Sequence, residues 1–310
     1  MNDTPSVRAS VASPARSGLL PLLYLFVLGL CFALSFILNR FATTNGVPVI
    51  PYVFWQTAGA AAILILIATG ARRLPRVTWP HLRIYVVMAF LNVAIPYWVL
   101  AFVAPKLPAS LLPIGLAMVP GVIYLMALAL RLEHFGVLRF AGISLGLAGV
   151  LLILLPKASL PEPGMAGWLA LSLVATISFA LRAVLVPLLR PPATPSLSLA
   201  CGLLIAASFI MFAVMAASGD WWAFGGDFGI GQGAVLAAMV KNALLLVLIF
   251  EVIRLAGPVF FGGVNYVSML LGVGLGIAIF GERHSMWVWL AIALVLAGLY
   301  LVNRGKAQAR

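Results

Sequence analysis

Long apolar runs alternate with short polar segments along nearly the whole chain, a pattern typical of a multi-pass membrane protein. One membrane span needs about 20 apolar residues, and breaks at charged residues, Pro and Gly divide the runs into ten predicted helices. These helices cover residues 18–39, 50–69, 83–104, 108–130, 137–155, 166–188, 196–216, 233–253, 257–279 and 285–303. We therefore expect an all-α integral membrane fold.

The composition supports this expectation. Of 310 residues, 64% are apolar and 8% are charged, too few charges to cover a water-soluble globule. The net charge of +12 comes from scattered basic residues, so nucleic-acid binding is not expected. Cys31 and Cys201 both lie within apolar runs, which argues against a disulfide framework or a Cys/His metal site. We expect no cofactor and no metal.

The distribution of basic residues predicts the orientation in the membrane. With the N-terminus inside, the inner segments hold 13 Lys and Arg residues and the outer segments hold four. The positive-inside rule then places both tails, 1–17 and 304–310, in the cytoplasm of a bacterial-type inner membrane. An aromatic belt at the outer face would contain Trp168, Trp221, Trp222, Trp287 and Trp289.

Short similar segments recur along the chain. The tripeptides around Glu133 and Glu282, and those around Gly149 and Gly298, are both 149 residues apart. One offset shared by two elements indicates two repeats of five helices, 18–155 and 156–303.

A third pair, around Ser35 and Ser178, is 143 residues apart and requires a small gap between the repeats. Because five is odd, the second repeat enters the membrane from the opposite side. The expected fold is an inverted repeat with a pseudo-two-fold axis in the membrane plane and a central cavity.

The end of the fourth helix of each repeat resembles a known family. The segment from Pro120 to Leu130-Arg131-Leu132-Glu133, and more closely Ile279-Phe280-Gly281-Glu282, resembles the Pro-then-"LGE" ending found in the drug/metabolite transporter superfamily, in particular its EamA-type exporters. Met269 replaces the expected second proline, and Gln56 stands where the family often has Arg. The resemblance covers residues 18–303 and implies export of amino acids or other small metabolites.

A transport site should contain polar groups within the spans, since such groups are costly in lipid and usually face a cavity. Lys241 and Asn242 in 233–253 are the sharpest feature, and Asn92 lies 149 residues before Lys241. We expect Lys241 to attract a substrate carboxylate, although a lysine could also reach the interface or a carbonyl. Asn92 could equally make an interhelical hydrogen bond.

Other residues complete the predicted site. Substrate contacts are also expected from Tyr97, Trp98, Asn265, Tyr266, Trp55, Gln56 and Asn39, and Ser35 is a further candidate. Three prolines should kink helices and act as hinges, namely Pro96, Pro113 and Pro120. Packing is the alternative for the aromatic residues and for the small-residue stripe at Asn265, Met269, Gly272 and Gly276.

The remaining charges have structural interpretations. Arg182 should reach the cytoplasmic interface, and Glu251 with Arg254 should form a pair one helical turn apart. Glu133 and Glu282 could cap or gate the repeats, or simply be solvated helix ends. Helices 137–155 and 285–303 are almost free of polar residues and are expected to form an outer scaffold or a homodimer surface, the protein otherwise being a monomer.

These features favour a secondary carrier for a small-molecule substrate. The chain contains no phosphate-binding loop and no hydrolase motif, so an enzyme is not expected. Alternating access around a site near the midplane is the expected mechanism. Facilitated transport is favoured over proton coupling, because the only carboxylate within a predicted span, Glu251, lies near its end. A multidrug or organic-cation exporter, and a channel or lipid-handling protein, remain alternatives.

Overall fold

The computed structural model describes residues 19–131, 134–154, 164–192, 194–225, 228–261 and 264–308, all of them in helices or connecting segments. Short breaks subdivide some helices, with a π-helical turn η1 (Phe90–Ala94) and a 3₁₀ turn η2 (Ala104–Lys106). The α-helices are α1 (Leu19–Thr44), α2 (Val49–Gly70), α3 (Trp79–Ala89), α4 (Ile95–Val103), α5 (Leu112–Leu116), α6 (Val119–Ala129), α7 (Val137–Leu154), α8 (Met165–Leu189), α9 (Ser196–Ser218), α10 (Ile230–Phe261), α11 (Val264–Phe280) and α12 (Met286–Gln308).

The helices reproduce the predicted spans. Seven segments of the described chain are long and apolar enough to cross a membrane, α3 to η2 and α5 to α6 each forming one of them. Three shorter apolar helices, at 137–153, 264–280 and 286–302, bring the total to the ten that were predicted. The all-helical membrane fold is confirmed at this level.

One predicted boundary was wrong. The break placed between 253 and 257 does not exist, because α10 continues to Phe261 and α11 begins at Val264. The segment contains Arg254 and Pro258, but a proline removes only one backbone donor and need not end a helix. The break in the fourth span, by contrast, falls where Pro120 predicts it, between α5 and α6.

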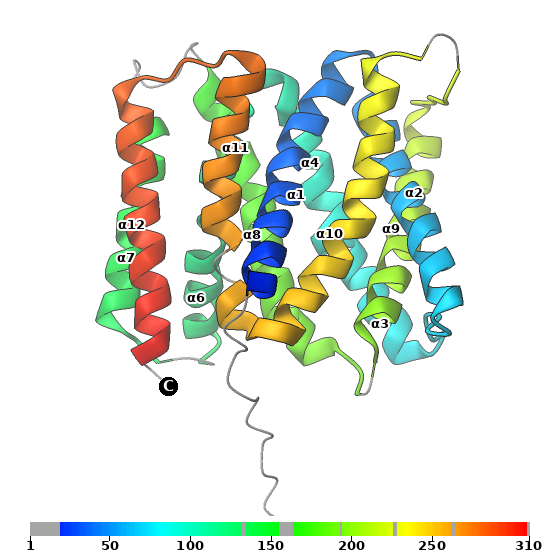
Figure 1. Ribbon diagram of the computed structural model, residues 1–310, viewed down its shortest axis with the longest axis horizontal. Coiled ribbons are helices and arrows are strands. Elements are labelled where there is room, and N and C mark those ends of the chain that lie inside the picture. The colour runs from blue at the N-terminus through cyan, green and yellow to red at the C-terminus, as the bar shows by residue number, and fades with distance from the viewer. Residues whose placement is uncertain are drawn as a thin grey trace, which may run out of the picture.

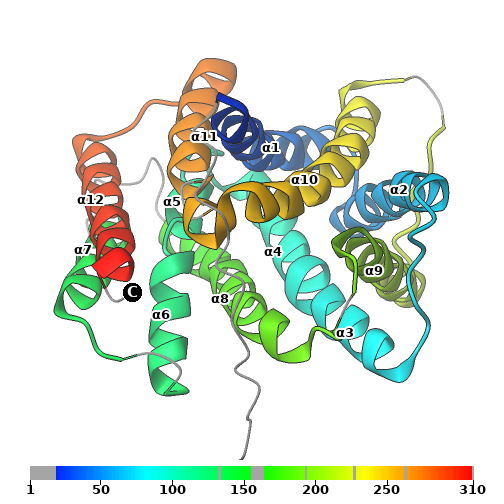
Figure 2. The same ribbon diagram turned by 60° about the horizontal axis from the view of Figure 1, so that its bottom comes forward.

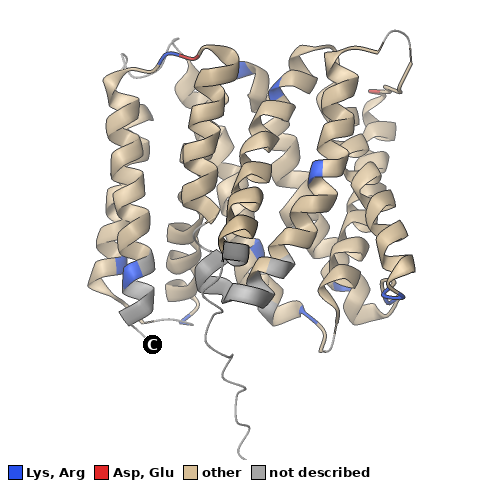
Figure 3. Cartoon of the chain, in the orientation of Figure 1, with Lys and Arg blue, Asp and Glu red and all other residues tan. Residues whose placement is uncertain are grey.

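The helices run side by side and most of their charged residues lie near their ends (Figures 1 and 3). We call the end that holds Arg40, Lys106 and Glu282 the outer end, following the predicted orientation. Side chains such as Leu66, Phe209 and Val240 are exposed on the outside of the bundle, as expected for a surface that faces lipid. The side-chain contacts of Glu251 and Arg254, and those of Glu133, lie outside the described residues.

Most helix contacts have a counterpart in which each helix is replaced by the helix at the same position of the other predicted repeat (Figure 2). Helix α1 packs on α10 and α11, and α8 packs on α4 and on the α5–α6 segment. Helix α2 packs on α10, and α3 packs on α9. Two further contacts, α2 with α9 and α7 with α12, join helices that hold the same position in the two predicted repeats.

The contact between α7 and α12 is built on glycine. A Cβ atom at Gly142 would lie 2.6 Å from the carbonyl oxygen of Gly298, and one at Gly149 would lie 2.9 Å from that of Ala291. The small-residue face of α7 is therefore occupied by α12 of the same chain, as close helix packing requires. The predicted homodimer would have to use the other faces of these two helices.

Candidate substrate site

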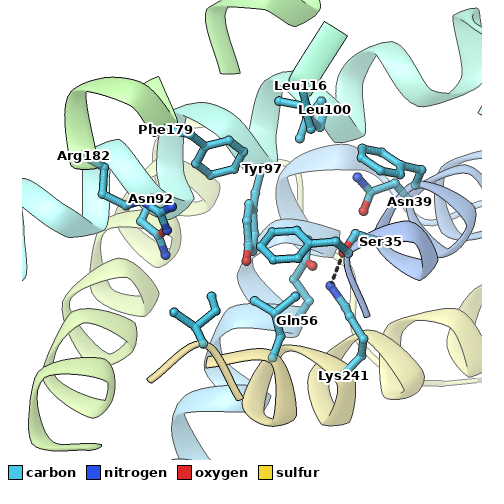
Figure 4. A pocket seen from close by; sticks show the side chains of 14 residues that line it. Ser35, Asn39, Gln56, Asn92, Tyr97, Leu100, Leu116, Phe179, Arg182 and Lys241 are labelled. Atoms are coloured by element: carbon cyan, nitrogen blue, oxygen red, sulfur yellow. Dashed lines mark hydrogen bonds between the residues drawn. The ribbon is translucent and has the colours of Figure 1, made fainter. Parts of the chain in front are cut away.

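A central cavity lies between six of the spans (Figure 4). Its free volume, the space that a water-sized sphere can reach, is about 40 Å³, which holds a few water molecules. Among the described residues, helices α9 and α11 contribute none to its lining. The cavity is lined by Phe32, Ser35, Phe36, Asn39, Gln56, Asn92, Tyr97, Leu100, Leu116, Phe179, Arg182, Lys241, Leu245 and Ile249.

Lys241 forms one polar side of the cavity. It is the twelfth residue of α10, about 16 Å along the helix at 1.5 Å per residue, and only 8% of its surface is exposed. Its Nζ donates to Ser35 Oγ at 2.8 Å and to Asn242 Oδ1 at 2.5 Å. Both partners are neutral, so the charge of Lys241 is hydrogen-bonded but not neutralised by either of them.

The hydrogen bonds of Lys241 determine the orientation of two neighbouring amides. Because an ammonium group can only donate, the atom of Asn242 that faces it must be the oxygen. The Nδ2 group of Asn242 then donates to Gln56 Oε1 at 2.9 Å. This leaves Gln56 Nε2, on a side chain that is 2% exposed, with no hydrogen-bond partner among the described residues.

Arg182 and Asn92 form the second polar side of the cavity. Arg182 Nη1 donates to Asn92 Oδ1 at 2.5 Å, and the guanidinium lies 5.3 Å from the ring centre of Phe179. The prediction that Arg182 reaches the cytoplasmic interface was therefore wrong. A polar partner inside the bundle holds its guanidinium at the cavity, and Figure 4 shows Tyr97 between this side and Lys241.

A π-helical turn holds Asn92 at the cavity. Ile95 N–H bonds to Phe90 O, and this wider turn immediately precedes Pro96, which has no N–H to continue a regular helix. The carbonyl oxygen of Leu91, which Ile95 would bind in a regular α-helix, instead accepts from Ser178 Oγ at 2.9 Å. Pro96 thus produces the predicted local distortion, and a residue of α8 satisfies the freed carbonyl.

The structure brings five of the ten predicted substrate residues to the cavity and separates the others from it. Lys241, Asn92, Tyr97, Gln56 and Asn39 line it. Ser35, the further candidate, also lines it.

The other five lie elsewhere. Asn242 is buried behind Gln56, and Trp98 is 40% exposed and stacks on Phe102. Trp55 Nε1 donates to Trp222 O at 2.9 Å. Asn265 and Tyr266 lie on α11, outside the lining.

The small-residue stripe of α11 is a packing surface. A Cβ at Gly272 would lie 2.7 Å from Pro113 Cγ, and one at Gly276 would lie 2.8 Å from the side chain of Ser110. Met269, on the same stripe, is fully buried. Of the two interpretations left open for this stripe, the structure favours helix packing.

A second group of polar contacts lies at the outer end of the bundle. We call it the outer cluster, and it consists of Arg40, Ala109, Ser110, Glu282 and His284. The carboxylate of Glu282 is 7% exposed and pairs with Arg40. It also accepts from the backbone N–H groups of Ala109 at 2.7 Å and Ser110 at 3.1 Å, and from the hydroxyl of Ser110.

Local backbone geometry aims Glu282 at these donors. Gly281 ends α11 with a φ of +63°, a left-handed conformation that glycine adopts readily. His284 Nε2 lies 2.8 Å from Ser110 Oγ, and burial lowers the pKa of His284, an effect that the nearby Glu282 carboxylate partly opposes. Glu282 is thus not a solvated helix end but a link from α11 to α1 and to the segment before α5.

Arg182 is the important residue that the sequence interpretation missed. Its position six residues from a predicted helix end made an interfacial role reasonable. The predicted repeat could have indicated its role. Arg182 lies 143 residues after Asn39, the same offset as between Ser35 and Ser178. Asn39 was predicted to line the cavity, and Arg182, its partner in the predicted second repeat, lines it as well.

Residues 19–155 match the EamA-like transporter family. The match confirms the resemblance to the drug/metabolite transporter superfamily, and the family indicates a membrane transporter of small molecules. A crystal structure of a protein 16% identical in sequence has a TM-score of 0.64 and covers 95% of this chain and 99% of its own. At this identity the likeness concerns the fold alone. No curated protein matches the chain.

Proposed function

We propose that this chain, whose residues 19–155 match the EamA-like transporters, is a secondary carrier that exports small metabolites, in the first instance amino acids. The observation that supports this most is the buried amino group of Lys241 at the central cavity. A substrate carboxylate would supply the opposite charge that its two neutral partners do not. Asn92 and Asn39 would bind the other polar atoms of the substrate.

The lining of the cavity supports alternating access between two inverted repeats. Four pairs of lining residues are separated by the repeat offsets of 149 or 143. A site at the interface of two repeats is what this mechanism requires. The pairs are Asn92 with Lys241, Leu100 with Ile249, Asn39 with Arg182 and Phe36 with Phe179.

Contacts elsewhere in the fold support the same symmetry. Gly142 approaches Gly298, and Gly149 approaches Ala291. The two contacts correspond, because Ala291 lies 149 residues after Gly142 and Gly149 lies 149 residues before Gly298. In this mechanism the outer cluster stabilises a state whose outer end is closed, since Glu282 joins α11 to Arg40 of α1.

Counterflow in liposomes tests the proposal. Liposomes that contain the protein and are loaded with an unlabelled amino acid should transiently accumulate the same amino acid, added outside in labelled form. The initial rate of this uptake should saturate with the outside concentration. Lys241→Ala should reduce this exchange by about tenfold or more, because it removes a charged hydrogen-bonding group. The control, Lys106→Ala, removes a lysine that lies outside the cavity between Phe102 and Trp168.

Four outcomes would contradict the proposal. Unchanged kinetics in Lys241→Ala would remove this residue from the site. Non-saturating flux at channel rates would indicate a channel, and competition by organic cations alone would indicate a multidrug exporter. Strong uphill uptake driven by a pH gradient would contradict the uncoupled mechanism that we favour.

A further inference from the structure

The central cavity contains two separate groups of hydrogen-bond donors. The first consists of Lys241 and Gln56, and the second is the guanidinium of Arg182 (Figure 4). Tyr97 lies between them. The two groups belong to different helices, with Lys241 on α10, Gln56 on α2 and Arg182 on α8.

The first group has donors left for a ligand. Lys241 has three N–H bonds and directs two of them to Ser35 and Asn242. Gln56 Nε2 is buried and has no partner among the described residues, and the amide orientation follows from Lys241 itself. A buried donor without an acceptor costs free energy. An anionic oxygen that accepts from Lys241 and from Gln56 would therefore stabilise both side chains.

The second group has the same property. Arg182 has five N–H donors in a planar fork that suits a carboxylate or another oxyanion, and one of them binds Asn92. No Asp or Glu is among the residues that line the cavity. Arg182, and Lys241 in its protonated form, therefore face lining residues whose acceptors are all neutral.

We infer that the cavity selects small metabolites with two anionic groups, one bound by Lys241 and Gln56 and the other by Arg182. This inference rests on the proposed transport function and specifies its substrate class. Two kinds of compound share the required chemistry, dicarboxylic acids and amino acids with an acidic side chain. A neutral amino acid would use the first group and leave Arg182 bonded to Asn92 but without an anionic partner.

Competition and binding measurements test this inference on the full-length protein. Succinate, glutamate, alanine and lysine are compared as competitors in counterflow, and their stabilisation of the protein against heat is measured in detergent, since a bound ligand raises the melting temperature. Succinate or glutamate should compete at lower concentration than alanine, and lysine least well. If glutamate competes and succinate does not, the substrates are acidic amino acids. If succinate competes and glutamate does not, the substrates are dicarboxylic acids.

The variant Arg182→Gln separates a selective contact from a structural role. It should raise the concentration of succinate or glutamate needed for half-maximal competition by about tenfold or more. The concentration of alanine needed should stay nearly unchanged, so that the selectivity ratio falls. Arg190→Gln, which makes the same change at a residue bonded to Thr194 outside the cavity, should leave the ratio as it is. Gln56→Leu should weaken binding of alanine and of the dianion alike.

The inference and the proposed function can fail separately. Preference for alanine or lysine over both succinate and glutamate, or an equal effect of Arg182→Gln on all substrates, would overturn the inference while transport remains. Heat stabilisation by a dianion without any counterflow would support the anion site and overturn the carrier. Neither stabilisation nor counterflow with any of the four compounds would overturn both.

Discussion

The outer cluster predicts that Glu282→Gln opens the outer end of the bundle. Each carboxylate oxygen of Glu282 serves two donors: Oε1 accepts from Arg40 and Ala109 N–H, and Oε2 accepts from the N–H and hydroxyl of Ser110. A glutamine keeps only one of these two oxygens and has an NH₂ group in place of the other. The substitution therefore removes the negative charge and places this NH₂ group against N–H or O–H donors that need an acceptor.

The magnitude follows from the burial of the pair. The side chain of Glu282 is 7% exposed and that of Arg40 is 28% exposed, so solvent screens the pair only partly. Removing one partner of a buried ion pair costs about 3–5 kcal/mol, and we take the lower bound because Arg40 is partly exposed. A loss of about 3 kcal/mol corresponds to roughly a hundredfold shift of the equilibrium toward the open outer end.

Distance measurements between spin labels would detect this shift. Labels at Thr44 and Arg283, both exposed at the outer end, report the separation of α1 from α11 once Cys31 and Cys201 are replaced by serine. Glu282→Gln should add a population at longer distance in nanodiscs. The control, Asp220→Asn, changes an exposed carboxylate on the segment after α9. Identical distance distributions for Glu282→Gln and the unmutated protein would refute the assignment of this cluster as the outer closure.

Three further predictions concern pH, packing and the π-helical turn. Burial lowers the pKa of His284, so the open or unfolded state binds a proton at this residue more readily than the closed state. The closed state should therefore lose stability as the pH falls below about 6.5, the ordinary pKa of histidine. Melting temperatures measured between pH 7 and 5 should fall more steeply than those of His284→Gln, and parallel curves would contradict this. Gly142→Leu should lower the melting temperature by overpacking α7 against α12, at a cost of about 1–3 kcal/mol, whereas Gly274→Ala, at a glycine with open space around it, should not; equal melting temperatures would show that this contact adapts. Pro96→Ala restores a backbone donor and should favour a regular helix that rotates Asn92 away from Arg182, raising the KM for exchange about tenfold; an unchanged KM would show that Asn92 keeps its place without the proline.

The sequence predicted the individual spans well because each span is a local property of the chain. Ten apolar runs, the breaks at proline and the depth of Lys241 follow from composition and spacing within single segments. The error at residues 253–257 shows the limit of local signals, since Pro258 is accommodated within α10. Boundaries depend on which backbone groups find partners, and that depends on neighbouring helices.

The candidate site was harder to predict because lining a cavity is a property of several helices together. Trp98 and Asn92 lie six residues apart on one span, yet Trp98 faces outward beside Phe102 and Asn92 meets Arg182. At 100° per residue, six residues already place the two side chains about 120° apart, so helical periodicity alone shows that they cannot share one face. The π-helical turn Phe90–Ala94, which contains Asn92, is the part that this periodicity cannot anticipate. Arg182 was misjudged for the related reason that its partner, Asn92, is 90 residues away in sequence.

By itself the sequence determined that this protein is a helical membrane protein with ten apolar segments, because the cost of charge in lipid acts on each segment separately. It also indicated the repeat offsets from which paired positions in the two halves can be found. The tertiary structure decided which polar residues meet. Lys241 and Gln56 face one cavity with Arg182, and Glu282 reaches Arg40 and Ser110, because a buried donor or charge is stabilised only by partners that the packing of distant helices brings within hydrogen-bond distance.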